Sequence, residues 1–104
     1  EVYRTGDQVR FASREDALYI QIDIPGCEKK DLDLNVDTDR RDIYIKGKRT
    51  VKTTDSEETQ TMNRSFSIGR EYDLNKVDFA YKNGVLEVTV PRRKKEEYIK
   101  KYTL

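Results

Sequence analysis

The chain has no histidine, no tryptophan, one cysteine and only two prolines among its 104 residues. Without histidine, a general base would have to be a carboxylate or a lysine with a shifted pKa. No pair of carboxylates falls on the inward side of an expected strand, and the sequence has no glycine-rich phosphate loop. We therefore expect no enzyme activity and no cofactor.

The one cysteine, Cys27, rules out an internal disulfide and favours a reducing compartment, so we expect the protein in the cytoplasm. We interpret Cys27 as a bystander rather than a redox switch, because Lys29 and Lys30 lower its pKa only if they lie close in space. The segment Asp37-Thr38-Asp39 is similar to the start of a calcium loop, but the glycine at the sixth position and the glutamate at the twelfth are missing. We therefore expect no metal site.

No apolar run is long enough to span a membrane, and no signal-peptide pattern is present. Lysine plus arginine (21) nearly cancels aspartate plus glutamate (20), so the net charge of +1 gives no overall field to attract nucleic acid or an anionic membrane. The basic run Arg92–Lys95 is followed by two glutamates, and we interpret it as a solvated tail. Because the sequence begins with Glu1 rather than methionine, we expect a fragment or a processed form.

Charged residues make up 39% of the chain and hydrophobic residues 35%, a composition that leans toward disorder. The apolar residues nevertheless alternate with polar ones in short runs, which is the pattern of half-buried β-strands. The runs lie at residues 9–12, 18–24, 32–36, 43–46 and, around a turn at Asp55-Ser56, in a long polar hairpin that ends near Ile68. We expect the run at 9–12 at a sheet edge and residues 1–8 as an arm or linker.

Asn83-Gly84 marks a hairpin turn, because a two-residue turn needs a positive φ at both central residues and these two types adopt it with least strain. A shift of one residue would exchange the two faces of the hairpin, so the turn and the apolar alternation support one register independently. Pro91 has no N–H for a ladder and ends the second strand. The predicted pairs are Lys82–Val85, Tyr81–Leu86, Phe79–Val88 and Val77–Val90.

Short strands, regular turns and the lack of a long helical pattern predict an all-β protein, an immunoglobulin-like antiparallel β-sandwich of about seven to eight strands. We divide the chain into an N-terminal arm remnant (1–8), the sandwich (9–92) and a C-terminal extension (93–104), whose helix-like spacing is too short for a stable helix alone. The long polar hairpin and the strand at 32–36 are the expected sheet edges. Since unpaired edges template pairing with another chain, we expect a domain that associates through its edges.

Several short motifs occur in a fixed order: Asp23-Ile24-Pro25-Gly26, Lys30-Asp31-Leu32, Ile45–Arg49, Arg64–Ile68 and Tyr81–Pro91. The ordered series resembles the small heat-shock proteins, specifically their alpha-crystallin domain, over residues 9–93. The sequence departs from the family pattern at Phe79, where alanine is usual, and at Gly69, where proline is usual. The nearest counterpart of the family's Ile-x-Ile tail anchor is Tyr102-Thr103-Leu104.

The resemblance implies an ATP-independent holdase of the stress response, which binds partly unfolded client proteins by their exposed apolar surface and limits their aggregation. It also implies a homodimer that assembles into larger oligomers. The main alternative is a monomeric co-chaperone adaptor on the same sandwich, and a third possibility is an assembly module without chaperone activity. A stable dimer would favour the small heat-shock protein over the adaptor.

Members of the family dimerise either by exchanging a strand carried on a long loop or by antiparallel pairing of one extended strand. The connection between Arg49 and Phe66 is short, so the resemblance implies pairing of the 57–68 strands across a two-fold axis. The family's interface arginine falls on Arg64, which would face carboxylates of the other subunit; the alternative is an ordinary solvated arginine. The expected interface residues are Asp55, Glu57, Glu58, Thr59, Thr61, Met62 and Arg64.

The groove in which the family docks its C-terminal tail is, by the same resemblance, lined by Leu34, Val36, Val77 and Phe79. Phe79 is bulkier than the usual alanine, so it is either plain core or it narrows the groove. We hypothesise weak or altered docking of the tail.

Overall fold

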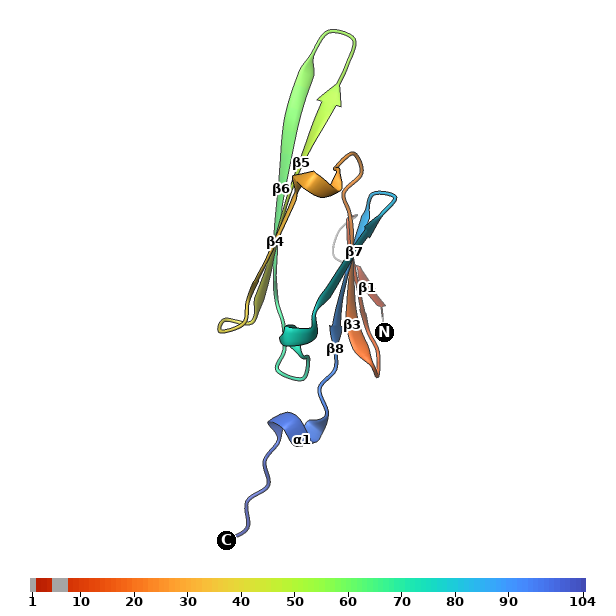
Figure 1. Ribbon diagram of the computed structural model, residues 1–104. Coiled ribbons are helices and arrows are strands. Elements are labelled where there is room, and N and C mark those ends of the chain that lie inside the picture. Colours follow the sequence, from red (N-terminus) through yellow and green to blue (C-terminus); the bar gives the residue numbers. More distant parts are fainter. Residues whose placement is uncertain (1, 5–7) are drawn as a thin grey trace.

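The computed structural model describes residues 2–4 and 8–104, with side chains from residue 8 onward. Its strands are β1 (Val2–Arg4), β2 (Val9–Ser13), β3 (Ala17–Asp23), β4 (Leu32–Asp37), β5 (Asp42–Lys52), β6 (Glu57–Ser67), β7 (Asp78–Lys82) and β8 (Val85–Pro91). They form one sheet with the order β1-β2-β3-β8-β7 and a second with the order β4-β5-β6. The two sheets face each other (Figure 1), which confirms the predicted antiparallel β-sandwich.

Three short helical turns connect or follow these strands in the described part of the chain. They are η1 (Lys29–Asp31), η2 (Leu74–Lys76) and α1 (Lys95–Tyr98). The side chain of Asp73 accepts a hydrogen bond from the N–H of Asn75 and so caps η2. This turn leads the chain from the loop after β6 into β7.

The hairpin of β7 and β8 has the predicted turn. Asn83 and Gly84 have φ angles of 52° and 77°, so both lie in the left-handed region that a two-residue turn requires. The predicted pairs up to Phe79–Val88 are confirmed. The Val77–Val90 pair is wrong, because the N–H of Val77 bonds to the carbonyl of Leu74 at the end of η2 and β7 begins one residue later.

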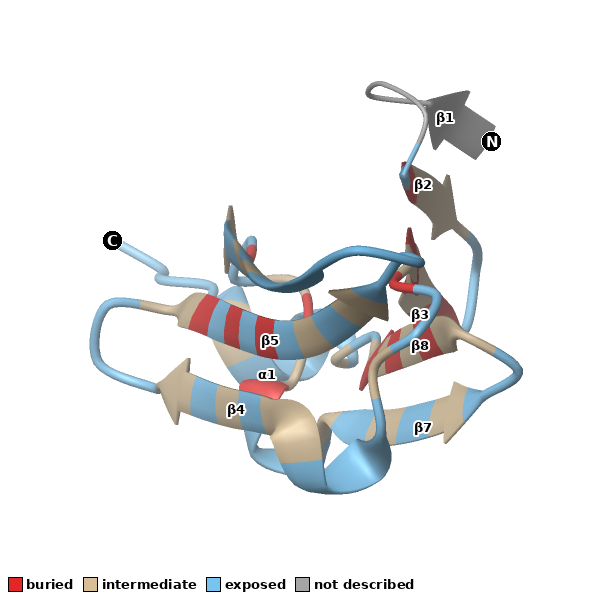
Figure 2. Ribbon diagram, turned by 90° about the horizontal axis from the view of Figure 1, so that it is seen from above, coloured by how far each residue is buried: buried red, intermediate tan, exposed pale blue. Residues whose placement is uncertain are grey.

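The core lies between the two sheets and is built from the inward residues of the central strands. Figure 2 shows the buried residues of β5 as bands that alternate with exposed ones, as the period of a half-buried strand requires. The fully buried side chains with the largest volumes are Ile20, Ile22, Ile43, Ile45, Leu86, Val88 and Val90. Burying one such side chain stabilises the fold by about 1.5–3 kcal/mol. Phe11 and Phe66 add an edge-to-face contact, with 5.5 Å between ring centroids.

The N-terminal region differs from the expectation. Val2–Arg4, placed in the predicted arm, form β1, and this strand pairs with β2. The strand at Val9–Ser13 therefore lies between β1 and β3 and is not a sheet edge, so that prediction is wrong. Residues 1 and 5–7 of the predicted arm lie outside the described residues, and the domain boundaries at residues 8 and 92 remain predictions.

The long polar hairpin is confirmed, but its turn lies at Thr54-Asp55, one residue before the predicted Asp55-Ser56. β5 and β6 pair one to one from Asp42–Ser67 to Lys52–Glu57, without a bulge, and their outer half extends beyond the sandwich (Figure 1). At the tip, the N–H of Thr53 donates to the carbonyl of Ser56 over 2.8 Å. The threonine hydroxyl also accepts from the N–H of Ser56, which reinforces the turn.

Candidate functional site: the free edge of β6

β6 is the outermost strand of its sheet, and in the described part of the chain no strand pairs with its other side. Two hydrogen bonds fix which of its backbone groups face outward. The N–H of Thr53 bonds to Ser56, and the N–H of Ile68 bonds to Arg41, so hydrogen-bonded pairs recur at every second position between these ends. The residues between them direct their N–H and C=O groups away from β5. They are Glu57, Thr59, Thr61, Asn63, Ser65 and Ser67.

All six outward residues have exposed side chains, and none is proline. A row of unpaired N–H and C=O groups without a bulge or a proline is the usual template for adding a strand from another chain. The edge thus has the chemistry for β-strand pairing along its whole length.

The inner face of the β5–β6 hairpin carries the other residues of β6. Because opposed residues share a face, Glu58, Gln60, Met62 and Arg64 lie on the side of Ile43 and Ile45, toward the first sheet. The structure therefore separates two of the predicted interface residues: Glu57 lies on the outer face, whereas Glu58 lies on the same face as Arg64.

Arg64 does not contact any carboxylate of its own chain among the hydrogen bonds and ion pairs of the described residues. Its Nη2 donates a hydrogen bond to Oε1 of Gln8 over 2.8 Å, across the margin between the two sheets. Both side chains are exposed, so a facing carboxylate can still reach the guanidinium. Its predicted pairing with another subunit remains a prediction.

A cavity of about 330 Å³ opens at the base of the hairpin, beside β6. Its lining includes Ile24, Cys27 and Met62 together with Arg49 and Arg64. Burial raises the pKa of the Cys27 thiol, and the nearby Arg49 lowers it by less. At neutral pH the thiol is therefore protonated, which agrees with the interpretation of Cys27 as unreactive.

Arg49 is a positioning residue that the sequence analysis missed. Its Nη1 donates to the carbonyl of Pro25 over 2.8 Å, and its Nε donates to Oε1 of Gln60 over 2.9 Å. These bonds tie the projecting hairpin to the turn after β3. The signal in the sequence is a pair of polar residues at inward positions, Arg49 opposite Gln60, where the buried run of β5 ends.

The four predicted groove residues lie at the opposite margin of the sandwich. Leu34 and Val36 belong to β4, Phe79 belongs to β7, and Val77 immediately precedes β7; Figure 2 shows these two edge strands along the same side of the molecule. All four side chains are half-buried and pack against the core. Their role in docking a tail remains a prediction.

The described residues contain no group of three or more histidine, cysteine, aspartate or glutamate side chains arranged to bind a metal ion. Every helix in that part of the chain is too short to cross a lipid bilayer.

A model described as the Hsp20/alpha crystallin family matches residues 10–103 of the sequence. The chain belongs to this family. The family is one of small heat-shock chaperones and not of enzymes. The named motifs of the sequence, from Asp23 to Pro91, therefore indicated the right family.

Among curated relatives, the heat shock 22 kDa protein, mitochondrial, of Pisum sativum is 38% identical over 88 residues, which cover 80% of this chain and 42% of that protein. A 15 kDa heat shock protein of Leptospira interrogans is 31% identical over 93 residues, which cover 84% of this chain and 70% of that protein. The chain thus spans less than half the length of the pea relative.

The fold is similar to that of solved small heat-shock proteins. The structure of a small heat-shock protein from Xylella fastidiosa aligns with a TM-score of 0.75 and 16% identity, over 98% of this chain and 96% of that one. Heat shock protein 16.0 of Schizosaccharomyces pombe aligns with a TM-score of 0.73 and 17% identity, over 98% of this chain and 85% of that one. At these identities the likeness concerns the fold alone.

Proposed function

We propose that this small heat-shock protein acts as an ATP-independent holdase, which binds partly unfolded client proteins and keeps them from aggregating. Membership of the family supports this activity. The observation that carries it furthest is the free edge of β6, a strand of 11 residues with no partner in the described part of the chain. An edge of this length supports a stable homodimer, from which larger assemblies form.

The proposed dimer pairs two β6 strands antiparallel across a two-fold axis. All outward residues of β6 have odd numbers. The outward backbone groups of the two strands therefore meet only in registers in which the numbers of two opposed residues add to an even sum. Among these registers, the one centred on Thr61 places Arg64 opposite Glu58 of the second copy, and by symmetry it does so twice. Glu57 cannot take this position, because it lies on the other face. We therefore propose Glu58 as the partner of Arg64 in the dimer.

The test of the chaperone activity is an aggregation assay. A reduced or heated model client is followed by light scattering with and without this protein, in the absence and presence of ATP. The proposal predicts suppression that increases with the molar ratio and does not depend on ATP. An inert protein at the same mass concentration serves as the control. Unchanged scattering at excess protein would contradict the holdase proposal.

The alternative, a monomeric co-chaperone adaptor on the same sandwich, is separated from it by light scattering of the protein alone. We expect a mass of at least two chains at micromolar concentration. A mass of one chain up to high concentration would instead favour the adaptor.

We also propose that the protein acts in the cytoplasm, as its single cysteine suggested. The pea relative is named as a mitochondrial protein, so the location of this chain needs its own test. Fractionation of cells that express the natural protein tests this proposal, and its recovery with an organelle would contradict it.

A further inference from the structure

Among the hydrogen bonds of the described residues, those that join the side chains of the C-terminal segment (93–104) to the sandwich come from Arg93. Its Nη1 donates a hydrogen bond to the carbonyl of Arg70 over 3.0 Å, and its Nη2 donates to the carbonyl of Glu97 over 2.9 Å. The same guanidinium lies 3.7 Å from the carboxylate of Glu97 and 5.3 Å from the ring centroid of Tyr98. One planar fork of donors thus joins α1 to the loop between β6 and η2.

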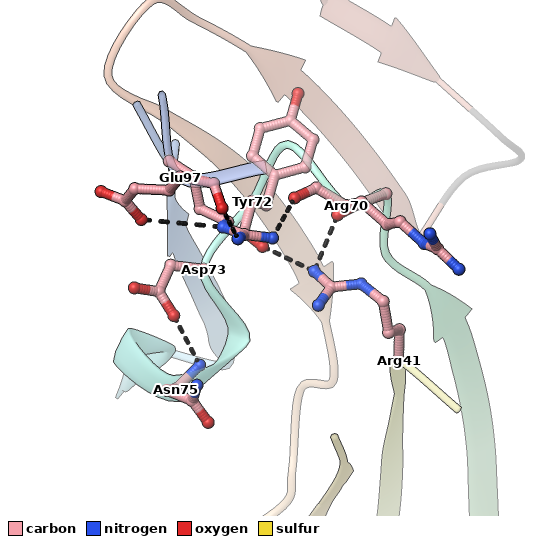
Figure 3. Close-up of polar contacts among 8 residues, drawn as sticks. Arg41, Arg70, Tyr72, Asp73, Asn75 and Glu97 are labelled. Atoms are coloured by element: carbon pink, nitrogen blue, oxygen red, sulfur yellow. Dashed lines mark hydrogen bonds and ion pairs between the residues drawn. The ribbon is translucent and has the colours of Figure 1, made fainter. Parts of the chain in front are cut away.

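That loop is itself held in place by the turn between β4 and β5. Arg41, in the turn before β5, donates hydrogen bonds to the carbonyls of Ile68, Gly69 and Tyr72. Figure 3 shows Arg41 and Glu97 on opposite sides of the loop that carries Arg70 and Tyr72. The anchor of Arg93 is therefore a rigid part of the domain and not a loose loop.

Beyond α1 the tail has no comparable support. Among the described residues, no hydrogen bond or ion pair involves residues 100–104. Ile99, Tyr102 and Leu104 are large apolar residues; Ile99 is 57% exposed, Tyr102 is 85% exposed and Leu104 is fully exposed. Figure 1 shows the tail running away from the sandwich. The apolar residues of the tail are therefore exposed to solvent, and the direction of the tail depends on how α1 is attached to the domain.

We propose that Arg93 is a positioning residue that fixes the direction in which the C-terminal segment leaves the domain. A four-residue helix is too short to be stable by itself, so α1 depends on contacts with the domain. The main-chain N–H of Arg93 bonds to the carbonyl of Glu71, but it leaves the chain free to turn from Lys94 onward. The side chain of Arg93 removes this freedom, because it binds the domain at the carbonyl of Arg70 and α1 at the carbonyl of Glu97.

The direct test is a distance distribution measured by electron spin resonance. Spin labels are placed at Lys76 and Glu96, both exposed, on a Cys27→Ser background, and the labelled protein is diluted with unlabelled protein. With Arg93 present we expect one narrow distribution. Arg93→Ala should broaden it about two-fold, as for a segment that changes from rigid to flexible. Arg93→Lys should broaden it as well, because an ammonium group keeps the charge but lacks the planar fork.

The matched control is Arg70→Ala, which removes a side chain from the same loop but leaves the carbonyl that Arg93 binds. Its distribution should stay narrow, and circular dichroism should report an unchanged sandwich for all three variants. An unchanged width in Arg93→Ala, or full rescue by Arg93→Lys, would overturn the proposal.

A role of Arg93 in oligomer assembly, through the direction of the tail, rests on the proposed function. If the dimers assemble further through their tails, Arg93→Ala should widen the mass distribution measured by light scattering, and an unchanged distribution would overturn the role in assembly. Client aggregation is measured separately. A negative result in the aggregation assay would therefore not affect the proposed role of Arg93. A negative spin-label result would likewise not affect the holdase proposal.

Discussion

Arg64 and Gln8 are joined by a hydrogen bond of 2.8 Å that crosses the margin between the two sheets. The bond keeps the guanidinium beside the free edge of β6, on the same face as Glu58. Within one chain this arginine has a neutral partner, so it remains available to a carboxylate from a second copy. The first prediction follows from this arrangement.

Exchange of the two charges tests the proposed register. Arg64→Glu and Glu58→Arg each place like charges opposite each other twice in the dimer, so each should weaken dimerisation by about ten-fold. The double variant restores opposite charges and should recover most of the affinity. Analytical ultracentrifugation at low and high salt measures both effects. If the double variant is as weak as the single ones, Glu58 is not the partner of Arg64.

Proline on the edge tests strand pairing itself. Thr61 directs its N–H outward, so Thr61→Pro removes an edge donor while it spares the bonds between β5 and β6. We expect dimerisation to weaken by roughly ten-fold or more, since two hydrogen bonds are lost by symmetry. Thr61→Val keeps the N–H and should pair normally. A dimer that tolerates the proline must form through another surface.

Gly84 allows a test of the turn at Asn83-Gly84. Its φ is 77°, and a Cβ at this position would lie 3.2 Å from Cα of Pro25. Gly84→Ala should therefore destabilise the fold by about 1–2 kcal/mol, the cost of a left-handed conformation for an L-residue. Asn83→Gly retains the turn and serves as the control. Urea denaturation measures both, and equal stability of Gly84→Ala and the parent would show that the turn can relax.

The burial of Cys27 predicts how the rate of its alkylation depends on pH. Because burial raises the pKa of the Cys27 thiol above its ordinary value, a smaller fraction of the thiol is ionised in the folded protein than in the unfolded chain at the same pH. Alkylation should be slow at pH 7, should accelerate as pH rises above 9, and should be faster in denaturant at each pH. An alkylation rate in the folded protein equal to the rate in denaturant would contradict the raised pKa of the Cys27 thiol.

Phe79 tests the hypothesis of altered tail docking. The ring is half-buried and packs against the core, at the margin of the sandwich where β4 carries Leu34 and Val36 (Figure 2). Phe79→Ala should open space there, so an Ile-x-Ile peptide should bind more tightly to the variant, with the shifts centred on Leu34 and Val77 in nuclear magnetic resonance titrations. The parent should bind weakly. Strong binding to the parent would mean that the ring does not narrow the groove.

The strands were predictable because alternation and turn chemistry agree. Asn83-Gly84 set the register of β7 and β8, and the polar hairpin was recognised from its β-branched residues. The failures have local causes. Val77 resembles a strand residue but bonds back to Leu74 in η2, and β1 is too short to show a pattern. The Arg64–Gln8 bond joins residues far apart in sequence, and no periodicity reports such a contact.

The bulge-free pairing of β5 and β6 leaves a regular edge, and this regularity affects how many registers the proposed dimer can adopt. The outward residues of β6 from Thr59 to Ser67 are small hydroxyl or amide side chains, which differ little from one position to the next. Sliding one copy along the other by two residues would keep the edge N–H groups of the overlapping residues matched with carbonyls and would change the charged contacts. A population of such dimers is therefore expected to contain several alignments in exchange, with Glu58 and Arg64 biasing the balance between them.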